Sequence, residues 1–145
     1  MQKTVNEVRC RFKSVSENES FARGLAVSFA VQASPTVTQL ADIKCAVSEA
    51  VTNAIVHGYR DCEGMVELTM KLYEDGNIVL IVKDNGVGIE NVKAAREPLF
   101  TTDTTGERSG MGFSIMESMM DAVTVRSKPG KGTVVTMRIK VGIMA

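Results

Sequence analysis

The chain has 145 residues, and its 17 basic residues balance 17 acidic ones, so the formal net charge at pH 7 is zero. This length predicts one domain over residues 1–145, which can bury roughly two-thirds of its unfolded surface. A protein that binds nucleic acids typically has a strong excess of basic residues, and this chain has none. Its longest purely apolar run, Ile78–Val82, is far shorter than the roughly 18 residues of a membrane span. We therefore expect no direct nucleic-acid partner and no membrane partner.

Hydrophobic periodicity predicts a strand and two helices in the first part of the chain. Apolar residues alternate with basic ones near residues 5–13, which indicates a strand. Ser16–Glu19 has the pattern of a capping box, so a helix should run from there to about Ala33, before Ser34–Pro35. A second helix follows and ends at Gly58. Its apolar stripe consists of Leu40, Ile43, Val47, Val51 and Ile55.

The second part of the chain predicts two hairpins. Residues Val66–Tyr73 alternate as a strand, and Asp75–Gly76 is a turn signal that leads into the run Ile78–Val82. The remaining expected elements are a short helix at Asn91–Arg96, a polar loop at Leu99–Gly110, a helix at Phe113–Asp121, and strands at Val123–Ser127 and Thr133–Val141. Because the helices are grouped rather than alternating with every strand, this order favours an α+β two-layer sandwich over a doubly wound parallel sheet.

The cysteine content indicates a reducing environment. Cys10, Cys45 and Cys62 are odd in number and form no Cys-x-x-Cys pair, which argues against a disulfide framework or a zinc site. The first residues, MQKTVNEVRCRFK, lack the apolar core of a signal peptide. We therefore expect a cytoplasmic protein.

A polar face of the second helix is the first candidate for chemistry. At 100° per residue, Glu49, Asn53 and His57 lie along one side, about opposite the apolar stripe. A carboxylate and an amide one helical turn apart can serve as a base and a metal ligand, whereas asparagine is a poor residue in the middle of a helix. A solvated face is the alternative, and the spacing alone leaves both interpretations open.

Two glycine-containing segments are the next candidates. Asp84–Ile89 directly follows the buried strand, so Gly86 and Gly88 would permit close approach of a ligand to the acceptor Asp84, although a simple turn is the alternative. Gly110–Ile115 opens a helix with Gly-x-Gly, where N–H groups and the helix dipole suit a phosphate. The sequence contains no Walker loop, and the dinucleotide fingerprint fails because no strand precedes this segment.

Taken together, these segments resemble the GHKL ATPase family in order and spacing. The resemblance covers about residues 40–140 and consists of SEAVTNAIVHG (48–58), DNGVGI (84–89), a threonine-rich loop, GMGFSI (110–115) and Gly132–Thr133. It implies the Bergerat type of two-layer sandwich, with a mixed, mostly antiparallel sheet and helices on one face. Within the family, SENESFAR and PLFTT are similar to sporulation anti-sigma kinases, which implies a protein serine kinase that sequesters a sigma factor and phosphorylates its anti-anti-sigma antagonist.

The resemblance also implies roles for individual residues. Glu49 would be the general base, Asn53 would ligate Mg²⁺, and Asp84 would accept a hydrogen bond from the adenine amino group of ATP, with Thr133 assisting through water. The rest of the implied nucleotide-binding set is Gly86, Gly88, Thr101, Thr102, Arg108, Ser109, Gly110, Met111 and Gly112. Arg108 is the cation in the expected lid and would reach the γ-phosphate, while a solvated loop arginine remains the alternative.

Two alternatives to the sporulation kinase stay open. One is a non-catalytic module in which ATP only orders the lid and the sigma-binding surface; intact Glu49 and Asn53 favour the enzyme. The other is a stress-response anti-sigma kinase of the RsbW type, against which the SENESFAR segment argues. From the length of 145 residues we expect none of the large second domains of other family members.

The first helix predicts protein partners from its composition. Phe21, Leu25 and Phe29 form one apolar stripe, yet most of the remaining cylinder is apolar as well. A helix of this kind is normally buried on more than one side, so we expect a homodimer formed through the first strand and first helix. Arg23, the one charged residue between Glu19 and Asp42, would anchor an acidic group of a partner, with a solvated arginine as the alternative.

Overall fold

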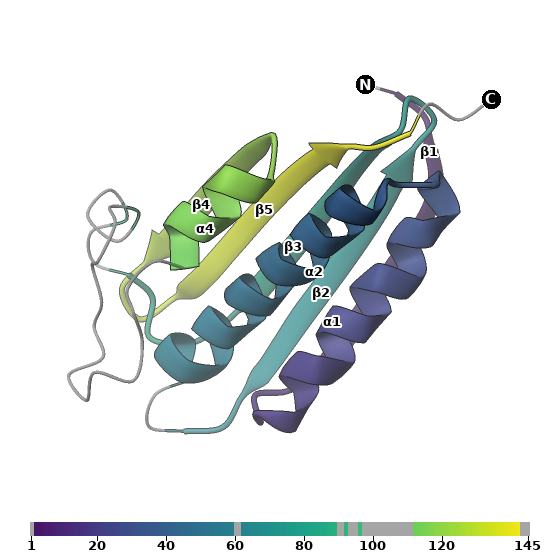
Figure 1. Ribbon diagram of the computed structural model, residues 1–145. Coiled ribbons are helices and arrows are strands. Elements are labelled where there is room, and N and C mark those ends of the chain that lie inside the picture. The colour runs from purple at the N-terminus through teal and green to yellow at the C-terminus, as the bar shows by residue number, and fades with distance from the viewer. Residues whose placement is uncertain (1, 60–61, 90–91, 93–95, 97–111, 143–145) are drawn as a thin grey trace.

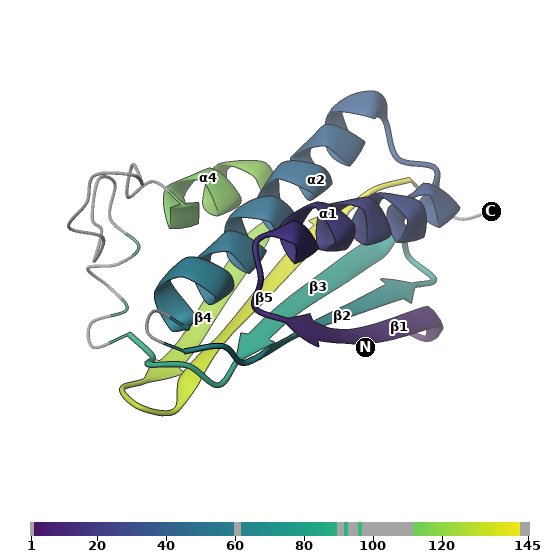
Figure 2. The same ribbon diagram turned by 90° about the horizontal axis from the view of Figure 1, so that it is seen from below.

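The protein is an antiparallel sheet covered on one face by helices. The computed structural model describes residues 2–59, 62–89, 92, 96 and 112–142. Its strands are β1 (Thr4–Lys13), β2 (Met65–Tyr73), β3 (Asn77–Asp84), β4 (Ala122–Lys128) and β5 (Gly132–Lys140), in the sheet order β1-β2-β3-β5-β4. Its helices are α1 (Glu17–Ala30), α2 (Val37–Thr52) and α4 (Gly112–Met119), and all lie on the same side of the sheet (Figure 1 and Figure 2).

This arrangement confirms the α+β two-layer sandwich. All pairings of the described strands are antiparallel, so no parallel pair of the expected mixed sheet is found among them. The Asp75–Gly76 turn joins β2 to β3 as predicted, and Gly76 has the positive φ of 90° that such a turn requires.

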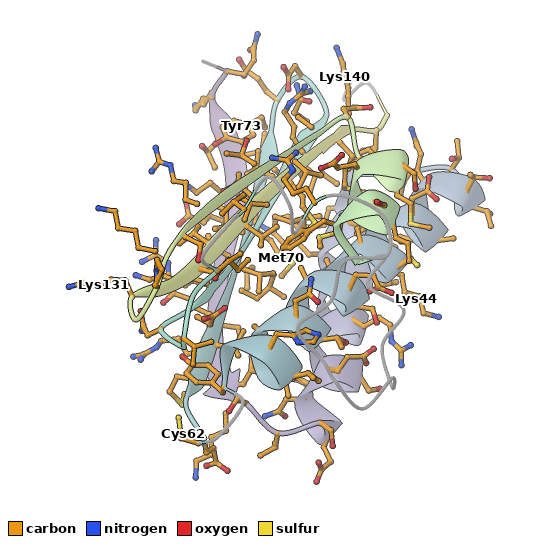
Figure 3. The ribbon with its side chains drawn as sticks, turned by 90° about the vertical axis from the view of Figure 1, so that its left-hand side faces the viewer. Lys44, Cys62, Met70, Tyr73, Lys131 and Lys140 are labelled. Atoms are coloured by element: carbon orange, nitrogen blue, oxygen red, sulfur yellow. The ribbon has the colours of Figure 1, made fainter. Side chains whose placement is uncertain are left out.

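The core lies between the sheet and the helices because strand residues alternate between the two faces. Leu68, Met70 and Leu72 of β2 are almost completely buried and belong to the same core cluster as Ile43 and Val47 of α2. Figure 3 shows Met70 in the interior of the molecule. The apolar stripe predicted on the second helix therefore faces this layer. The stripe predicted on the first helix faces it only in part: Phe29 is buried, but Phe21 is 51% exposed. The buried side of α1 instead consists of Ala22, Ala26, Phe29 and Ala30.

The helix starts differ from the prediction. The Ser16–Glu19 capping box does not form, because the Ser16 side chain caps no backbone N–H and instead donates to Glu17. The reciprocal capping box lies at α2, where Gln39 N donates to Thr36 Oγ1 at 3.0 Å and Thr36 N donates to Gln39 Oε1 at 2.9 Å. After Ala30 the chain makes a short 3-10 turn, η1 (Val31–Ala33), rather than continuing the α-helix.

The end of the second helix also differs. The sequence predicts one α-helix to Gly58, but α2 ends at Thr52 and continues as a π-helix, η2 (Asn53–Gly58). The bond from Tyr59 N to Ala54 O, 3.2 Å long, spans five residues and marks the wider turn. A π segment turns less per residue than an α-helix, so His57 does not follow Asn53 at the α-helical angle assumed above.

Two predicted elements fall on parts of the chain outside the described residues. The expected helix at Asn91–Arg96 is described only at residues 92 and 96, and the expected loop at Leu99–Gly110 is not described. Among the described helices, none has both the length and the apolar content that crossing a membrane requires.

Candidate nucleotide site

Asp84 is the buried acidic group at the centre of the site. It ends β3, pairs in register with Thr133 of β5, and is 6% exposed. Its Oδ1 accepts a hydrogen bond of 2.9 Å from Gly86 N. Burial raises the pKa of Asp84, while hydrogen bonds from the backbone N–H groups of Gly86 and Thr133 act in the opposite direction. A carboxylate held in this way is a hydrogen-bond acceptor at the C-terminal end of a strand.

Glycines bring three backbone segments against this carboxylate. A Cβ on Gly58 would lie 2.9 Å from Asp84 Cγ, and a Cβ on Gly86 would lie 1.9 Å from Gly58 O. On the other side, a Cβ on Gly132 would lie 2.1 Å from Asp84 O. Any side chain at these three positions would clash with a neighbouring segment or with Asp84 itself. Glycine at each position therefore allows the end of η2, the loop after β3 and the start of β5 to meet.

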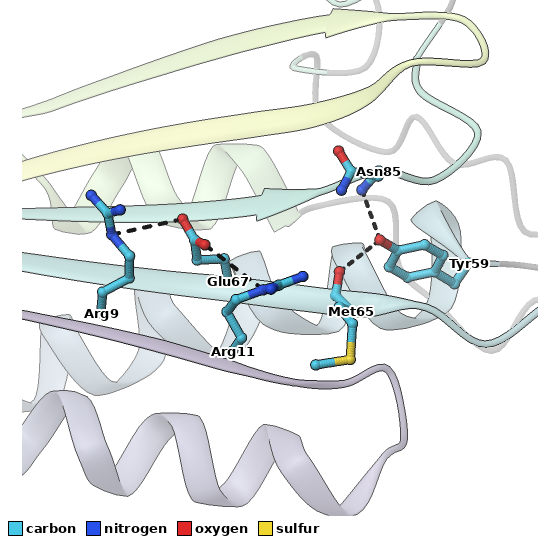
Figure 4. Close-up of polar contacts among 6 residues, drawn as sticks. All are labelled: Arg9, Arg11, Tyr59, Met65, Glu67 and Asn85. Carbon is cyan, nitrogen blue, oxygen red and sulfur yellow. Dashed lines mark hydrogen bonds and ion pairs between the residues drawn. The ribbon is translucent and has the colours of Figure 1, made fainter.

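Hydrogen bonds fix the loop after β3. Tyr59 Oη donates to Met65 O at 2.6 Å and accepts from Asn85 N at 2.7 Å, as Figure 4 shows. Val87 N donates to Gly58 O at 2.8 Å. Gly88, with φ of 77°, completes the loop, which is consequently attached to both η2 and β2.

A hydroxyl pair lies beside Asp84. Thr133 is 8% exposed, and its Oγ1 lies 2.8 Å from Ser127 Oγ on β4. Ser127 Oγ also donates to Gly132 O and accepts from Ile89 N, each at 2.8 Å. Ser127 thus connects β4, β5 and the loop after β3.

A second group of polar side chains lies where α2 faces the start of α4. A Cβ on Gly112 would lie 3.1 Å from Asn53 Nδ2 and 3.3 Å from Glu49 Oε2. Glu49 and Asn53 therefore share one side of the helix, as predicted, and that side faces α4 rather than open solvent. Glu49 also contributes, after burial itself, to raising the pKa of the Cys45 thiol.

The structure brings together some predicted site residues and leaves others undescribed. Glu49, Asn53 and Gly112 form one group, and Asp84, Gly86, Gly88 and Thr133 form the other. Thr101, Thr102, Arg108, Ser109, Gly110 and Met111 lie outside the described residues. Within the described part of the chain, no cluster of three or more His, Cys, Asp or Glu side chains could hold a metal ion.

The donor chemistry of these two groups fits a magnesium nucleotide. Mg²⁺ takes few protein ligands and keeps water and phosphate oxygens, so an asparagine amide oxygen beside a carboxylate is sufficient protein ligation. The buried acceptors Asp84 and Thr133 suit a base that donates hydrogen bonds. The two groups are therefore complementary to the two ends of such a ligand.

The surroundings of Arg23 differ from the prediction. Arg23 is not isolated, because its guanidinium lies 3.7 Å from the Glu19 carboxylate and 3.5 Å from Ser20 Oγ on its own helix. Glu19 in turn accepts a hydrogen bond from Ser48 Oγ of α2. Phe21 of α1 and Val31, the first residue of η1, are each 51% exposed, so this segment retains an outward apolar side after α1 has packed on α2.

Sequence reasoning missed Ser127 and Tyr59. Ser127 had a detectable signal, because it takes an inward position after Val123 and Val125 in an alternating strand, where a hydroxyl needs partners. Tyr59 directly follows Gly58, but nothing in the sequence indicates that its hydroxyl reaches Asn85.

Known proteins are similar to this chain in sequence and in fold. The sequence profile of the Histidine kinase-like ATPase domain matches residues 13–139. A relative from Geobacillus sp. (strain WCH70), named Anti-sigma F factor, is 52% identical over 134 residues, which cover 92% of this chain and 91% of the relative. A protein of the same name from Clostridium acetobutylicum is 48% identical over 139 residues, 96% of each chain.

Solved structures share the fold at low sequence identity. The RsbU and RsbW domains of a Mycobacterium tuberculosis protein superpose with a TM-score of 0.68 and 17% identity over 97% of this chain and 35% of that one. The SiaB–SiaC complex from Pseudomonas aeruginosa gives a TM-score of 0.55 and 11% identity over 95% of this chain and 91% of that one. At this identity the likeness concerns the arrangement of helices and strands.

Proposed function

Because the chain belongs to the Histidine kinase-like ATPase domain family, and within it to the anti-sigma F factors, we propose that it is an ATP-dependent serine kinase that also sequesters a sigma factor. The sigma factor is of the sporulation F type, and the phosphorylated protein is its anti-anti-sigma antagonist. The name of the relatives, Anti-sigma F factor, supports the first assignment. The second follows the sequence resemblance to sporulation anti-sigma kinases. We propose that the enzyme acts in the cytoplasm as a single ATP-binding domain.

The observation that carries the ATP-binding part is the burial of Asp84 among three glycines. The carboxylate accepts backbone hydrogen bonds from Gly86 and Thr133, and Gly58 leaves no space beside it for anything but hydrogen. An ionised carboxylate has about four lone-pair positions, so Asp84 can accept a further hydrogen bond from a ligand beside these two. In the proposal, Asp84 accepts from the adenine amino group, and Gly86 and Gly88 allow the ring to approach.

The phosphate end of ATP is assigned to the other group. Asn53 would hold Mg²⁺, and the ion would neutralise charge on the phosphates. Gly112 allows the start of α4 to approach that side of α2. Glu49 accepts the proton of the substrate serine hydroxyl while the serine oxygen bonds to the γ-phosphorus. The bond between the γ-phosphorus and the β,γ-bridging oxygen breaks, and ADP leaves with its electrons. Thr101, Thr102, Arg108, Ser109, Gly110 and Met111 complete the proposed nucleotide-binding set.

The partner surface is assigned to α1 and β1. The exposed side chains of Phe21 on α1, Val31 at the start of η1 and Val5 on β1 support a homodimer through this side of the molecule. Arg23, held beside Glu19, is proposed to bind an acidic group of the sigma factor or of the antagonist.

A reconstitution with three proteins tests the proposed function. The chain is mixed with Mg·ATP labelled at the γ-phosphate, with a sporulation sigma factor, and with its antagonist. Label on an antagonist serine, together with ATP-dependent co-purification of the sigma factor, is the expected result. Co-purification without label would favour the non-catalytic module, and preference for a stress-response sigma factor and its antagonist would favour the RsbW-type kinase.

A further inference from the structure

Ser127 has a complete set of hydrogen bonds that fixes the direction of each one. A serine hydroxyl has one proton to donate and two lone pairs to accept. The carbonyl oxygen of Gly132, 2.8 Å from Ser127 Oγ, can only accept, so it receives the serine proton. The amide of Ile89, also at 2.8 Å, can only donate, so it occupies one lone pair.

These assignments decide the contact between Ser127 and Thr133. With the serine proton given to Gly132, the 2.8 Å contact with Thr133 Oγ1 requires the threonine hydroxyl to donate. Thr133 Oγ1 therefore keeps its lone pairs for another group. Among the described residues, the Thr133 hydroxyl has Ser127 as its hydrogen-bond partner.

The Thr133 hydroxyl, with its lone pairs unused, lies next to a second acceptor, the carboxylate of Asp84. Thr133 pairs in register with Asp84, and both residues are less than a tenth exposed. The ionised carboxylate of Asp84 also only accepts. Two neighbouring acceptors favour a ligand edge that donates to them, directly or through one water, and oppose an edge that presents a carbonyl oxygen there.

We propose that Ser127 is a specificity-determining positioning residue: by accepting the Thr133 proton it holds that hydroxyl as an acceptor, and so makes the site select 6-amino purines over 6-oxo purines. This inference rests on the proposed ATP-binding function of the same site. Ser127 acts through Thr133 and does not itself contact the base. Its bond from Ile89 also attaches β4 to the loop that carries Gly86 and Gly88.

A double-mutant cycle read by nucleotide binding tests the inference. Dissociation constants for ATP and for inosine triphosphate, which has a carbonyl at C6, are measured for the unmodified chain, Ser127→Ala, Thr133→Val and the double variant. In Ser127→Ala the threonine hydroxyl loses its acceptor and can turn to donate, so the preference for ATP should fall about tenfold. In the Thr133→Val background, Ser127→Ala should leave the preference unchanged.

The controls separate a specific effect from loss of structure. Ser127→Thr keeps the hydroxyl and should retain the preference, and Thr124→Ala, on the same strand but the opposite face, should do the same. If Ser127→Ala does not fold, Ser127→Cys supplies the same comparison with a weak acceptor of similar size.

Each outcome decides between the inference and the proposed function. An unchanged preference in folded Ser127→Ala, or an equal fall with and without the Thr133 hydroxyl, would refute the role of Ser127 and leave ATP binding intact. Equal weakening of both nucleotides would show that Ser127 has a structural role alone. Failure of the unmodified chain to bind ATP would instead refute the nucleotide site, and the inference with it.

Discussion

The Cα of Gly58 lies so close to the Asp84 carboxyl group that an added Cβ would sit 2.9 Å from its Cγ and Oδ1. The carboxylate also accepts hydrogen bonds from the backbone N–H groups of Gly86 and Thr133, so moving it would disturb these bonds. This contact sets the depth at which the carboxylate lies between η2 and β3. Changes at Gly58 should therefore act through Asp84.

Gly58→Ala should weaken ATP binding by at least tenfold and lower the free energy of unfolding by about 1–3 kcal/mol, because the methyl group displaces the carboxylate. Gly24→Ala is the matched control, since nothing lies within 4 Å of its Cβ position on α1. It should leave ATP affinity unchanged and stabilise the helix by up to about 1 kcal/mol. Calorimetric titration and urea unfolding check both; equal ATP affinity in the two variants would contradict the assignment.

Asp84→Ala should weaken ATP binding by roughly 10- to 150-fold, because a hydrogen bond to a charged acceptor is lost, at about 1.5–3 kcal/mol. GTP binding to the unmodified chain should be much weaker than ATP binding. Comparable affinities for the two nucleotides would mean that Asp84 does not recognise the base.

The free energy of unfolding of the nucleotide-free chain should depend on pH because the pKa of Asp84 is raised in the folded state. Burial makes the folded state hold this proton more tightly than the unfolded state, so the residue's contribution declines as pH rises from the ordinary aspartate pKa through the raised one. Asp84→Asn cannot titrate. Its free energy of unfolding relative to the unmodified chain should therefore increase with pH across this window, as urea unfolding at several pH values would show. A relative stability that stays flat or declines would contradict the sign.

Glu49→Gln should separate chemistry from binding. The amide keeps the shape but cannot accept the serine proton, so phosphorylation should fall by roughly 10²–10⁴-fold while ATP and sigma-factor binding are largely kept. Glu74→Gln, an exposed residue after β2, makes the same change of charge as a control. Label transfer measured at saturating ATP distinguishes them, and full activity of Glu49→Gln would remove this residue from the mechanism.

Arg23→Glu should weaken binding of the sigma factor or the antagonist by more than about 2 kcal/mol, because it places a carboxylate against Glu19 and reverses the proposed anchor. ATP affinity should not change. Arg126→Glu on the edge strand β4 reverses the same charge away from α1 and should bind both partners normally. Normal partner binding by Arg23→Glu would show that this arginine, which lies beside Glu19, does not anchor either partner.

The periodic parts of the fold were predictable, and the parts that depend on contacts distant in sequence were not. Alternation and apolar stripes predicted the strands and helices because burial of one face determines both. The capping box predicted at Ser16 does not form, since Glu19, its expected return partner, accepts a hydrogen bond from Ser48, which is 29 residues away. For the site, order and spacing predicted Asp84 and Glu49, whereas the hydroxyl of Tyr59 meets Asn85 only in the folded chain.

The π-helix η2 makes the chain length between Asn53 and Gly58 a fixed quantity. A π turn contains one residue more than the α turn that it replaces, so removing a single residue there would let α-helical hydrogen bonding continue from α2 without interruption. The helix would be more regular, but each later residue would be carried about 100° around its axis. Gly58 would leave Asp84, and a bulkier neighbour would take its place. Deletion of one residue here should therefore disrupt the site even though it makes the helix more regular.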